Sequence, residues 1–204
     1  MSKNKNKGKI IILSGPSGAG KTTLYKDLLK KNKNLVKSVS ATTRPMRTGE
    51  VHKRDYFFIS FKMFAYKLKA GHFLEYENFF GNYYGTPHKA VRNLVSLGKN
   101  VLLCIDVNGA KNVVKKYPNA IKIFIMTPTI EDLKQRLLKR GSEDLRTIEN
   151  RLKRVKQELN EVKNYEFVIV NDNLSQAKSK LNKIIKGQIG RSSEVMMRKP
   201  SKDI

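Results

Sequence analysis

The chain has 204 residues, of which 39% are hydrophobic and 29% charged, and 42 Lys and Arg against 17 Asp and Glu give a formal net charge of +25. This length fits one domain with small insertions, and the composition excludes a disordered, collagen-like or coiled-coil chain. The single Cys104 excludes an internal disulfide and a Cys-rich zinc site, and the three histidines are too scattered for a metal cluster. We therefore expect a soluble protein of a reducing, cytoplasmic compartment.

The positive charge has two explanations. Lys and Asn alternate along the whole chain, as in residues 30–34, which is typical of a compositional preference on solvated faces. A basic surface is also what a protein that binds nucleic acid or another polyanion needs. The chain shows no motif that reads nucleic acid, and its longest early apolar run, residues 10–13, is far too short to span a membrane. We expect neither a membrane nor a specific nucleic acid as partner.

Short apolar runs alternate with helical patterns along the chain. Residues 9–14 form a continuous apolar run rich in β-branched side chains, as in a buried parallel strand. A Gly-rich turn follows, and then a helical pattern over residues 21–31. Later apolar runs cover 101–105, 121–126 and 167–170, between helical stretches at 87–97, 109–116, 130–139, 147–163 and 174–186. This alternation predicts an α/β fold in which helices flank a parallel sheet.

Two segments interrupt that alternation. Residues 38–86 are rich in aromatic side chains among turn residues and short alternating strands, which predicts an inserted mixed subdomain. Residues 140–146 are polar, contain Gly141 and separate two helical stretches, which suits a mobile lid. After Gly187 the chain is polar and without periodicity, and we expect a frayed tail there.

A phosphate loop carries the clearest chemistry. It runs from Gly15 to Thr22 with the sequence GPSGAGKT, between the first strand and the first helix, which is the context that such a loop requires. Its glycines let backbone N–H groups turn toward phosphate oxygens, and the helix that follows adds the positive end of its dipole. Lys21 is expected to reach the β- and γ-phosphates, and the Thr22 hydroxyl to ligate Mg²⁺. The expected ATP-binding residues of this loop are Gly15, Pro16, Ser17, Gly18, Ala19, Gly20, Lys21, Thr22 and Thr23.

An anion fork follows in the inserted segment. Arg44 and Arg47 are three residues apart, and Tyr56 lies further on. Guanidinium groups bind phosphate in a bidentate manner at any working pH, and a tyrosine hydroxyl adds one hydrogen bond. On charge alone, a solvated pair of arginines remains an equal alternative.

The stretch from Ser40 to Phe58 resembles the guanylate kinase signature, and residues 73–75 and 81–86 resemble the second half of that family's GMP site. The phosphate loop, residues 101–106, the arginines near residue 140 and residues 167–172 extend the resemblance over residues 9–186. It implies a P-loop nucleoside monophosphate kinase that converts ATP and GMP to ADP and GDP in purine nucleotide metabolism. It also implies a core of residues 9–37 and 87–186, a GMP-binding insertion at 38–86 and a helical lid at 136–151, between extensions at 1–8 and 187–204.

The resemblance assigns roles to single residues. It implies that the GMP phosphate is held by Arg44, Arg47, Tyr56 and Tyr84, that guanine is read by Ser40, Glu75 and Thr86, and that Asp106 and Arg151 lie close to GMP. An ionised Glu75 only accepts hydrogen bonds, and guanine offers two adjacent donors, N1–H and the 2-amino group, whereas adenine has an acceptor at N1. For Asp106 a purely structural role as the N-cap of the next helix stays open.

For transfer itself, the resemblance implies catalytic roles for Lys21, Arg44, Arg136, Arg140 and Arg151, with Arg136 and Arg140 also on ATP. Asn171 matches a position near adenine. The substrates would be ATP and GMP, with dGMP as a further acceptor, Mg²⁺ as cofactor and a monomer as the working form. A scaffold domain of the same fold is the alternative, but such domains typically lack an intact phosphate loop.

Two residues depart from the family pattern. Lys53 stands where the signature usually has Gly, so a turn that needs a positive φ is expected to be reshaped or strained there. Cys104 stands where the family usually has a carboxylate, two residues before Asp106. We expect both departures to affect rate and pocket geometry more than reaction type.

Overall fold

The computed structural model describes residues 7–79, 81–140 and 145–189; the side chains of Arg140 and of residues 145–147 lie outside this description. A five-stranded sheet forms the centre, in the order β2-β7-β1-β8-β9, and every neighbouring pair in it is parallel. Its strands are β1 (Ile10–Ser14), β2 (Leu35–Lys37), β7 (Asn100–Cys104), β8 (Ile121–Met126) and β9 (Phe167–Val170). The predicted α/β class and parallel sheet are confirmed.

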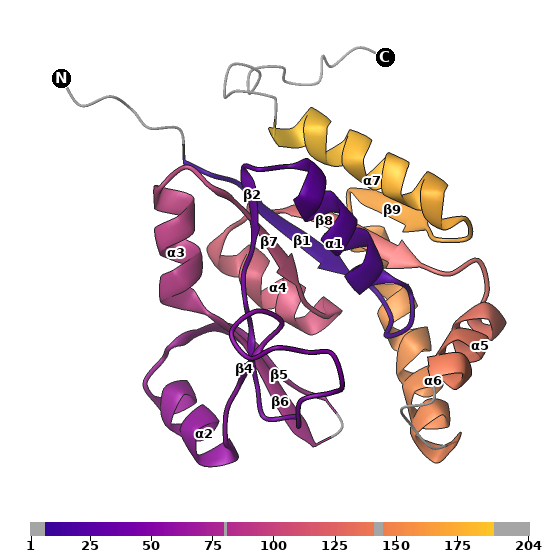
Figure 1. Ribbon diagram of the computed structural model, residues 1–204, viewed down its shortest axis with the longest axis horizontal. Helices are drawn as coiled ribbons and strands as arrows, with labels where there is room; N and C mark the ends of the chain where they lie inside the picture. Colours follow the sequence, from indigo (N-terminus) through magenta and orange to yellow (C-terminus); the bar gives the residue numbers. More distant parts are fainter. Residues whose placement is uncertain (1–6, 80, 141–144, 190–204) are drawn as a thin grey trace, which may run out of the picture.

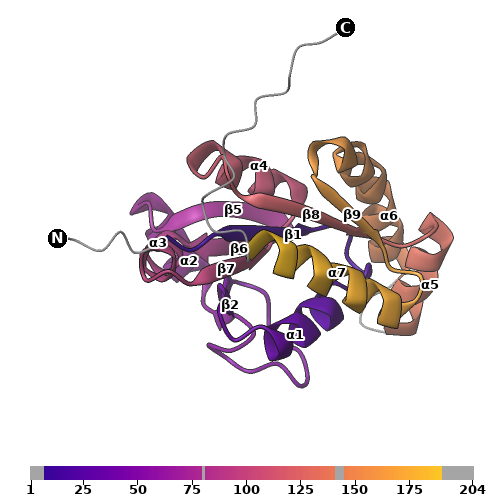
Figure 2. The same ribbon diagram turned by 90° about the horizontal axis from the view of Figure 1, so that it is seen from above.

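Helices cover both faces of this sheet (Figures 1 and 2). Ile11 and Leu13 of β1 pack in one apolar cluster, whereas Ile10 and Ile12 pack in another, because successive side chains of a strand point to opposite faces. The first cluster is completed by α1 (Lys21–Lys31) and α7 (Leu174–Ile189), and the second by α3 (His88–Ser96) and α4 (Val107–Lys116). Figure 2 shows α1 and α7 on one side of the sheet and α4 on the other.

A second, four-stranded sheet lies at one end of the molecule (Figure 1). It has the order β4-β3-β6-β5 and mixes parallel and antiparallel pairs. Its strands are β3 (Ala41–Thr42), β4 (Phe57–Phe58), β5 (Phe73–Phe79) and β6 (Asn82–Pro87), and α2 (Phe61–Lys69) packs on it. The rings of Phe64 and Phe73 stack 4.5 Å apart in its small core. Leu74 of β5 packs instead with Ile12 and Leu103 of the main core, so this sheet is anchored beside the central one.

Two helices lie beyond the carboxyl ends of β8 and β9. They are α5 (Ile130–Arg140) and α6 (Leu145–Asn160), and a 3₁₀ turn, η1 (Val162–Asn164), follows. The predicted lid falls partly between them, and residues 141–144 lie outside the described part. No helix in the described part of the chain is long and apolar enough to cross a membrane.

Most sequence predictions of single elements agree with this arrangement, and two elements were missed. The helix α2 was not expected inside a segment interpreted as strands, and the three-residue edge strand β2 was not expected at all. Lys53 has a φ of 68°, which confirms that the turn in which it replaces the usual Gly needs a positive φ.

Candidate active site

A groove of about 1050 Å³ opens at the carboxyl ends of β1 and β7, where ligands bind in open α/β sheets. It extends from the phosphate loop to the small sheet and to α6. Most of the predicted site residues line it: Gly15, Ser17, Gly18, Gly20, Lys21, Thr22, Thr23, Ser40, Arg44, Arg47, Tyr56, Glu75, Tyr84, Asp106, Arg136 and Arg151. Residues from both sheets therefore share one cavity.

The phosphate loop has the backbone that its glycines allow. Gly15, Gly18 and Gly20 have φ values of 136°, 94° and 94°, which side-chain-bearing residues rarely adopt. A Cβ atom at Gly15 would lie 1.9 Å from the Ile125 carbonyl oxygen, so β8 leaves room for glycine alone. The Lys21 ammonium donates hydrogen bonds to the carbonyls of Gly15 at 2.5 Å and of Pro16 at 2.9 Å. Lys21 thus binds the first two residues of its own loop and lines the groove.

Asn171 lies behind this loop. It is 3% exposed, and its side-chain amide donates to the Ala19 carbonyl at 2.8 Å. A Cβ at Gly20 would lie 2.3 Å from that amide nitrogen. Asn171 therefore supports the loop backbone, and its predicted contact with adenine stays a prediction.

Arginines from the two outer helices contact the phosphate loop or the residue that supports it. Arg136 of α5 donates to the Asn171 carbonyl at 2.7 Å, and Arg151 of α6 donates to the Ser17 hydroxyl at 2.6 Å. Both arginines line the groove, and their predicted contact with ATP stays a prediction. The third predicted lid arginine, Arg140, has a side chain outside the described part of the chain.

The anion fork lies across the groove on the small sheet. Arg44 is held by Glu50, to which its Nη2 donates at 2.8 and 3.0 Å, and the Arg47 amide donates to the same carboxylate at 2.8 Å. Burial opposes the charge of Glu50, but these hydrogen bonds outweigh burial and lower its pKa. The Tyr56 and Tyr84 rings meet edge to face at 6.0 Å, and the Arg44 guanidinium lies 5.7 Å from the Tyr56 ring centroid. The Arg44 side chain is thus held by these contacts and is not a freely solvated surface arginine.

Behind Tyr56 lies a lysine that does not line the groove. Lys37 donates to the Asp55 carbonyl at 2.9 Å, and its ammonium lies 5.0 and 5.2 Å from the ring centroids of Tyr25 and Tyr56. Burial lowers the pKa of Lys37, and the carboxylate of Asp55 opposes that shift. Burial also raises the pKa of Cys104, so the thiol is neutral at pH 7 and brings no charge to Lys37.

The third part of the groove centres on Glu75, which is 6% exposed. Thr86 donates a hydrogen bond of 2.5 Å to its Oε1, and the Ser40 hydroxyl lies 3.5 Å from the Thr86 hydroxyl. Burial raises the pKa of Glu75 to about 7, against the hydrogen bond from Thr86 that lowers it. A Cβ at Gly109 would lie 2.5 Å from Glu75 Oε2, so only glycine allows α4 to approach this carboxylate. The three predicted guanine readers therefore form one connected group.

Asp106 has the structural role that the sequence left open, and its predicted place near GMP stays a prediction. It is the N-cap of α4, where its Oδ1 accepts from the Gly109 amide at 2.8 Å. Its other oxygen, Oδ2, accepts from Arg154 at 2.6 Å, and the residue also lines the groove. Burial raises the pKa of Asp106, with Glu77 adding to the shift and Arg154 opposing it.

Sequence reasoning missed several residues of this groove or of its supports. They are Lys37, Glu50, Glu77, Phe79, Gly109, Arg154 and Glu158. Glu50 had a detectable signal, since it follows Arg47 by three residues in a turn. Arg154 and Glu77 are 77 residues apart in sequence, and no local pattern pairs them.

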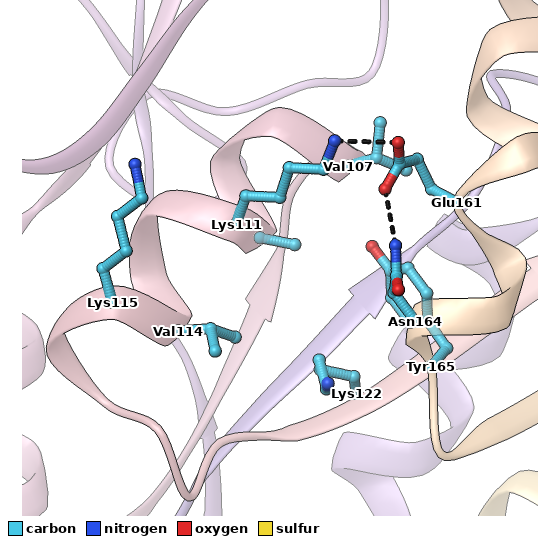
Figure 3. A pocket seen from close by; sticks show the side chains of 9 residues that line it. Val107, Lys111, Val114, Lys115, Lys122, Glu161, Asn164 and Tyr165 are labelled. Atoms are coloured by element: carbon cyan, nitrogen blue, oxygen red, sulfur yellow. Dashed lines mark hydrogen bonds and ion pairs between the residues drawn. The ribbon is translucent and has the colours of Figure 1, made fainter.

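A second, smaller cavity of about 260 Å³ lies between α4 and the segment after α6 (Figure 3). Lys111 and Glu161 form an ion pair of 2.8 Å at its edge, and Asn164 donates to the same glutamate at 2.8 Å. It shares no lining residue with the large groove. None of the predicted site residues lines this second cavity.

Comparison with known proteins agrees with this geometry. The sequence profile "Guanylate kinase" matches residues 7–188. A guanylate kinase of Clostridium perfringens is 44% identical over 180 residues, which are 88% of this chain and 83% of that protein. A guanylate kinase of Nostoc is 45% identical over 174 residues, which are 85% of this chain and 87% of that protein. The crystal structure of guanylate kinase from Anaplasma phagocytophilum superposes with a TM-score of 0.76 at 33% identity, over 92% of this chain and 89% of that one. By sequence and by fold, the chain belongs to the guanylate kinase family.

Proposed function

We propose that this chain transfers the γ-phosphoryl group of ATP to GMP and so forms ADP and GDP. The observation that carries the proposal is that Lys21 of an intact phosphate loop and the buried carboxylate of Glu75 line one groove. The first is suited to a triphosphate and the second to a base with two adjacent donors. The family membership supports the same reaction.

On the ATP side, the phosphate loop would surround the β- and γ-phosphates with backbone N–H groups. Lys21 would exchange its hydrogen bonds to the Gly15 and Pro16 carbonyls for phosphate oxygens. Arg151 of α6 donates to Ser17 of this loop, and Arg136 of α5 donates to Asn171, which supports the loop. They would stabilise the charge that develops during transfer, which is electrostatic catalysis by preorganised cations.

The residues present fit a magnesium ion that arrives with the nucleotide. Thr22 is the second residue of α1 and lines the groove, to which it brings one hydroxyl oxygen. Mg²⁺ commonly keeps several waters and takes one or two protein ligands together with phosphate oxygens. When bound, the ion would neutralise charge on the phosphates that are being separated.

On the acceptor side, Arg44, Arg47, Tyr56 and Tyr84 would hold the GMP phosphate. Arg44 and Tyr56 are prepared for this task by Glu50 and by the ring contacts of the small sheet. Glu75 would accept from guanine N1–H and the 2-amino group, with Thr86 and Ser40 alongside. Phosphoryl transfer needs in-line positioning and charge neutralisation more than a dedicated base, and these residues would supply both.

The test is an assay of ADP release with ATP, Mg²⁺ and one of five acceptors: GMP, dGMP, AMP, CMP or UMP. We expect GMP and dGMP to support turnover and the other three to give only background hydrolysis. Equal rates with AMP and GMP would contradict the role of Glu75, and background release with all five would contradict the activity itself.

A further inference from the structure

Arg154 of α6 joins three carboxylates from three different elements. Its Nη2 lies 2.6 Å from Asp106 Oδ2 and 3.1 Å from Glu77 Oε1, and its Nε lies 3.5 Å from Glu158 Oε1. Glu77 belongs to β5 of the small sheet, Asp106 to the N-terminus of α4, and Glu158 to α6 itself. All three carboxylates line the large groove, whereas Arg154 does not.

The same guanidinium also contacts an aromatic ring. Arg154 Cζ lies 4.8 Å from the Phe79 ring centroid, and Arg151 Cζ lies 5.1 Å from it. The Phe79 ring in turn meets the Tyr84 ring edge to face at 6.4 Å. A chain of contacts therefore runs from α6 through Phe79 to a predicted ligand of the GMP phosphate.

The charge around Asp106 explains why a cation is needed there. Burial raises the pKa of Asp106 and of Glu158, so both resist ionisation, and Glu77 adds repulsion at Asp106. The positive charge of Arg154 acts in the opposite direction and lowers the pKa of both Asp106 and Glu158. Like charges close together in a partly buried site destabilise one another unless a cation lies between them. Because Gly109 binds the other oxygen of Asp106, Arg154 also fixes the orientation of this carboxylate.

We propose that Arg154 is a positioning residue for the acceptor nucleotide. It holds Asp106 in one orientation at the guanine end of the groove, and through Glu77 and Phe79 it keeps the small sheet against α6. It acts without touching either nucleotide. This inference rests on the proposed GMP kinase activity.

Steady-state kinetics of Arg154→Met test it, with Lys153→Met as the control, because that neighbour on the same helix is exposed and carries the same charge. We expect KM for GMP to rise on the order of tenfold or more, since displaced positioning groups cost such factors, while KM for ATP stays within about twofold. Lys153→Met should leave both constants unchanged. Arg154→Lys keeps the charge but loses the fork that reaches two carboxylates, so it should give an intermediate KM for GMP.

A second variant separates positioning from mere stability. Removing Arg154 leaves Glu77 without its cation beside Asp106, so adding Glu77→Gln to Arg154→Met should recover part of the lost GMP affinity. A merely structural Arg154 would instead give additive or worsened effects. The inference is overturned if Arg154→Met and Arg154→Lys leave KM for GMP unchanged, or if they weaken ATP and GMP equally. A wild-type protein that does not turn over GMP would overturn the proposed function first.

Discussion

Thr86 and Glu75 face each other across the β5–β6 pair, and the Thr86 hydroxyl donates a 2.5 Å hydrogen bond to Glu75 Oε1. The carboxyl is buried enough for its pKa to rise to about 7, while Thr86 stabilises the ionised form. The group that would read guanine therefore changes charge close to physiological pH.

The first prediction is that GMP affinity depends on pH with a midpoint near 7. Guanine's two donors favour ionised Glu75, so the dissociation constant should rise by up to about tenfold per unit as pH falls below the midpoint. The raised pKa also means that the folded state binds this proton more tightly than the unfolded state. The contribution of Glu75 to folding stability is therefore fully present at pH values below the ordinary glutamate pKa of 4.5. That contribution is lost as pH rises through the folded-state pKa of about 7. Calorimetric titration of GMP between pH 5.5 and 8.5 measures the midpoint.

Thr86→Val is the internal comparison for that measurement. Loss of the donor should raise the Glu75 pKa further and move the midpoint to higher pH. The GMP phosphate, whose second pKa is about 6, titrates equally with both proteins and cancels in the difference. Identical midpoints would show that Glu75 does not govern the profile.

The second prediction concerns base selection. Glu75→Gln places an amide where two guanine donors need an acceptor, so kcat/KM for GMP should fall on the order of a hundredfold or more, while KM for ATP stays unchanged. Glu149→Gln, on an exposed position of α6, is the matched control and should behave like wild type. Equal weakening of both nucleotides would make Glu75 a structural residue.

The third prediction concerns Lys21. Replacing it by Met removes a cation from the developing charge, and kcat should fall on the order of a hundredfold or more. The fold should persist, because Lys21 lies at the groove and belongs to neither of the two apolar clusters that pack on the central sheet. Thermal melting followed by circular dichroism checks the fold, and Lys30→Met on the same helix is the control. A kcat near the wild-type value would contradict the phosphate-loop assignment.

The fourth prediction joins Cys104 to Lys37. A carboxylate at position 104 would lie near Lys37, a half-buried lysine that forms no ion pair among the described residues. Cys104→Asp should therefore fold, with KM for GMP equal to or below that of wild type. Adding Lys37→Met removes one of the two cations near the new carboxylate and leaves Lys21, so the double variant should unfold at lower urea concentration than Cys104→Asp at pH 7. Equal destabilisation of both variants would show that Lys37 does not reach position 104.

The sequence allowed the parallel sheet and the phosphate loop to be predicted because both depend on local patterns. Continuous apolar runs gave strands buried on both faces, and Gly15 to Thr22 follow a strand and open a helix. The helix α2 had a weaker signal, the cap in which Ser60 Oγ accepts from the Met63 amide, inside an aromatic-rich stretch. Its aromatic side chains suit strands as well as helices, so the pattern favoured the wrong element.

The residues of the candidate site also fall into those that a local motif predicts and those that only the tertiary structure brings together. Arg44, Glu75 and Lys21 belong to motifs whose spacing is visible, so their place at the groove was predictable. Arg154 and Lys37 contact residues that are distant in sequence: α6 meets β5 and the start of α4, and β2 meets the turn that contains Asp55. Such pairs depend on tertiary structure, which local spacing does not encode.

The last prediction concerns what the net charge of +25 does. Both substrates are polyanions, and a positive field around a cleft raises their encounter rate by an amount that fades as salt screens it. We expect kcat/KM for GMP to decline between about 0.05 and 0.5 M KCl more than kcat does, since the Debye length shortens over that range while the bound complex keeps its contacts. DNA and RNA should bind without sequence preference, in the micromolar range or weaker, with an affinity that falls steeply with salt, because such binding rests on counterion release alone. Fluorescence anisotropy with several unrelated oligonucleotides over the same salt series measures this. Selective binding of one sequence that persists at high salt would contradict a purely electrostatic role and would point to a nucleic-acid partner.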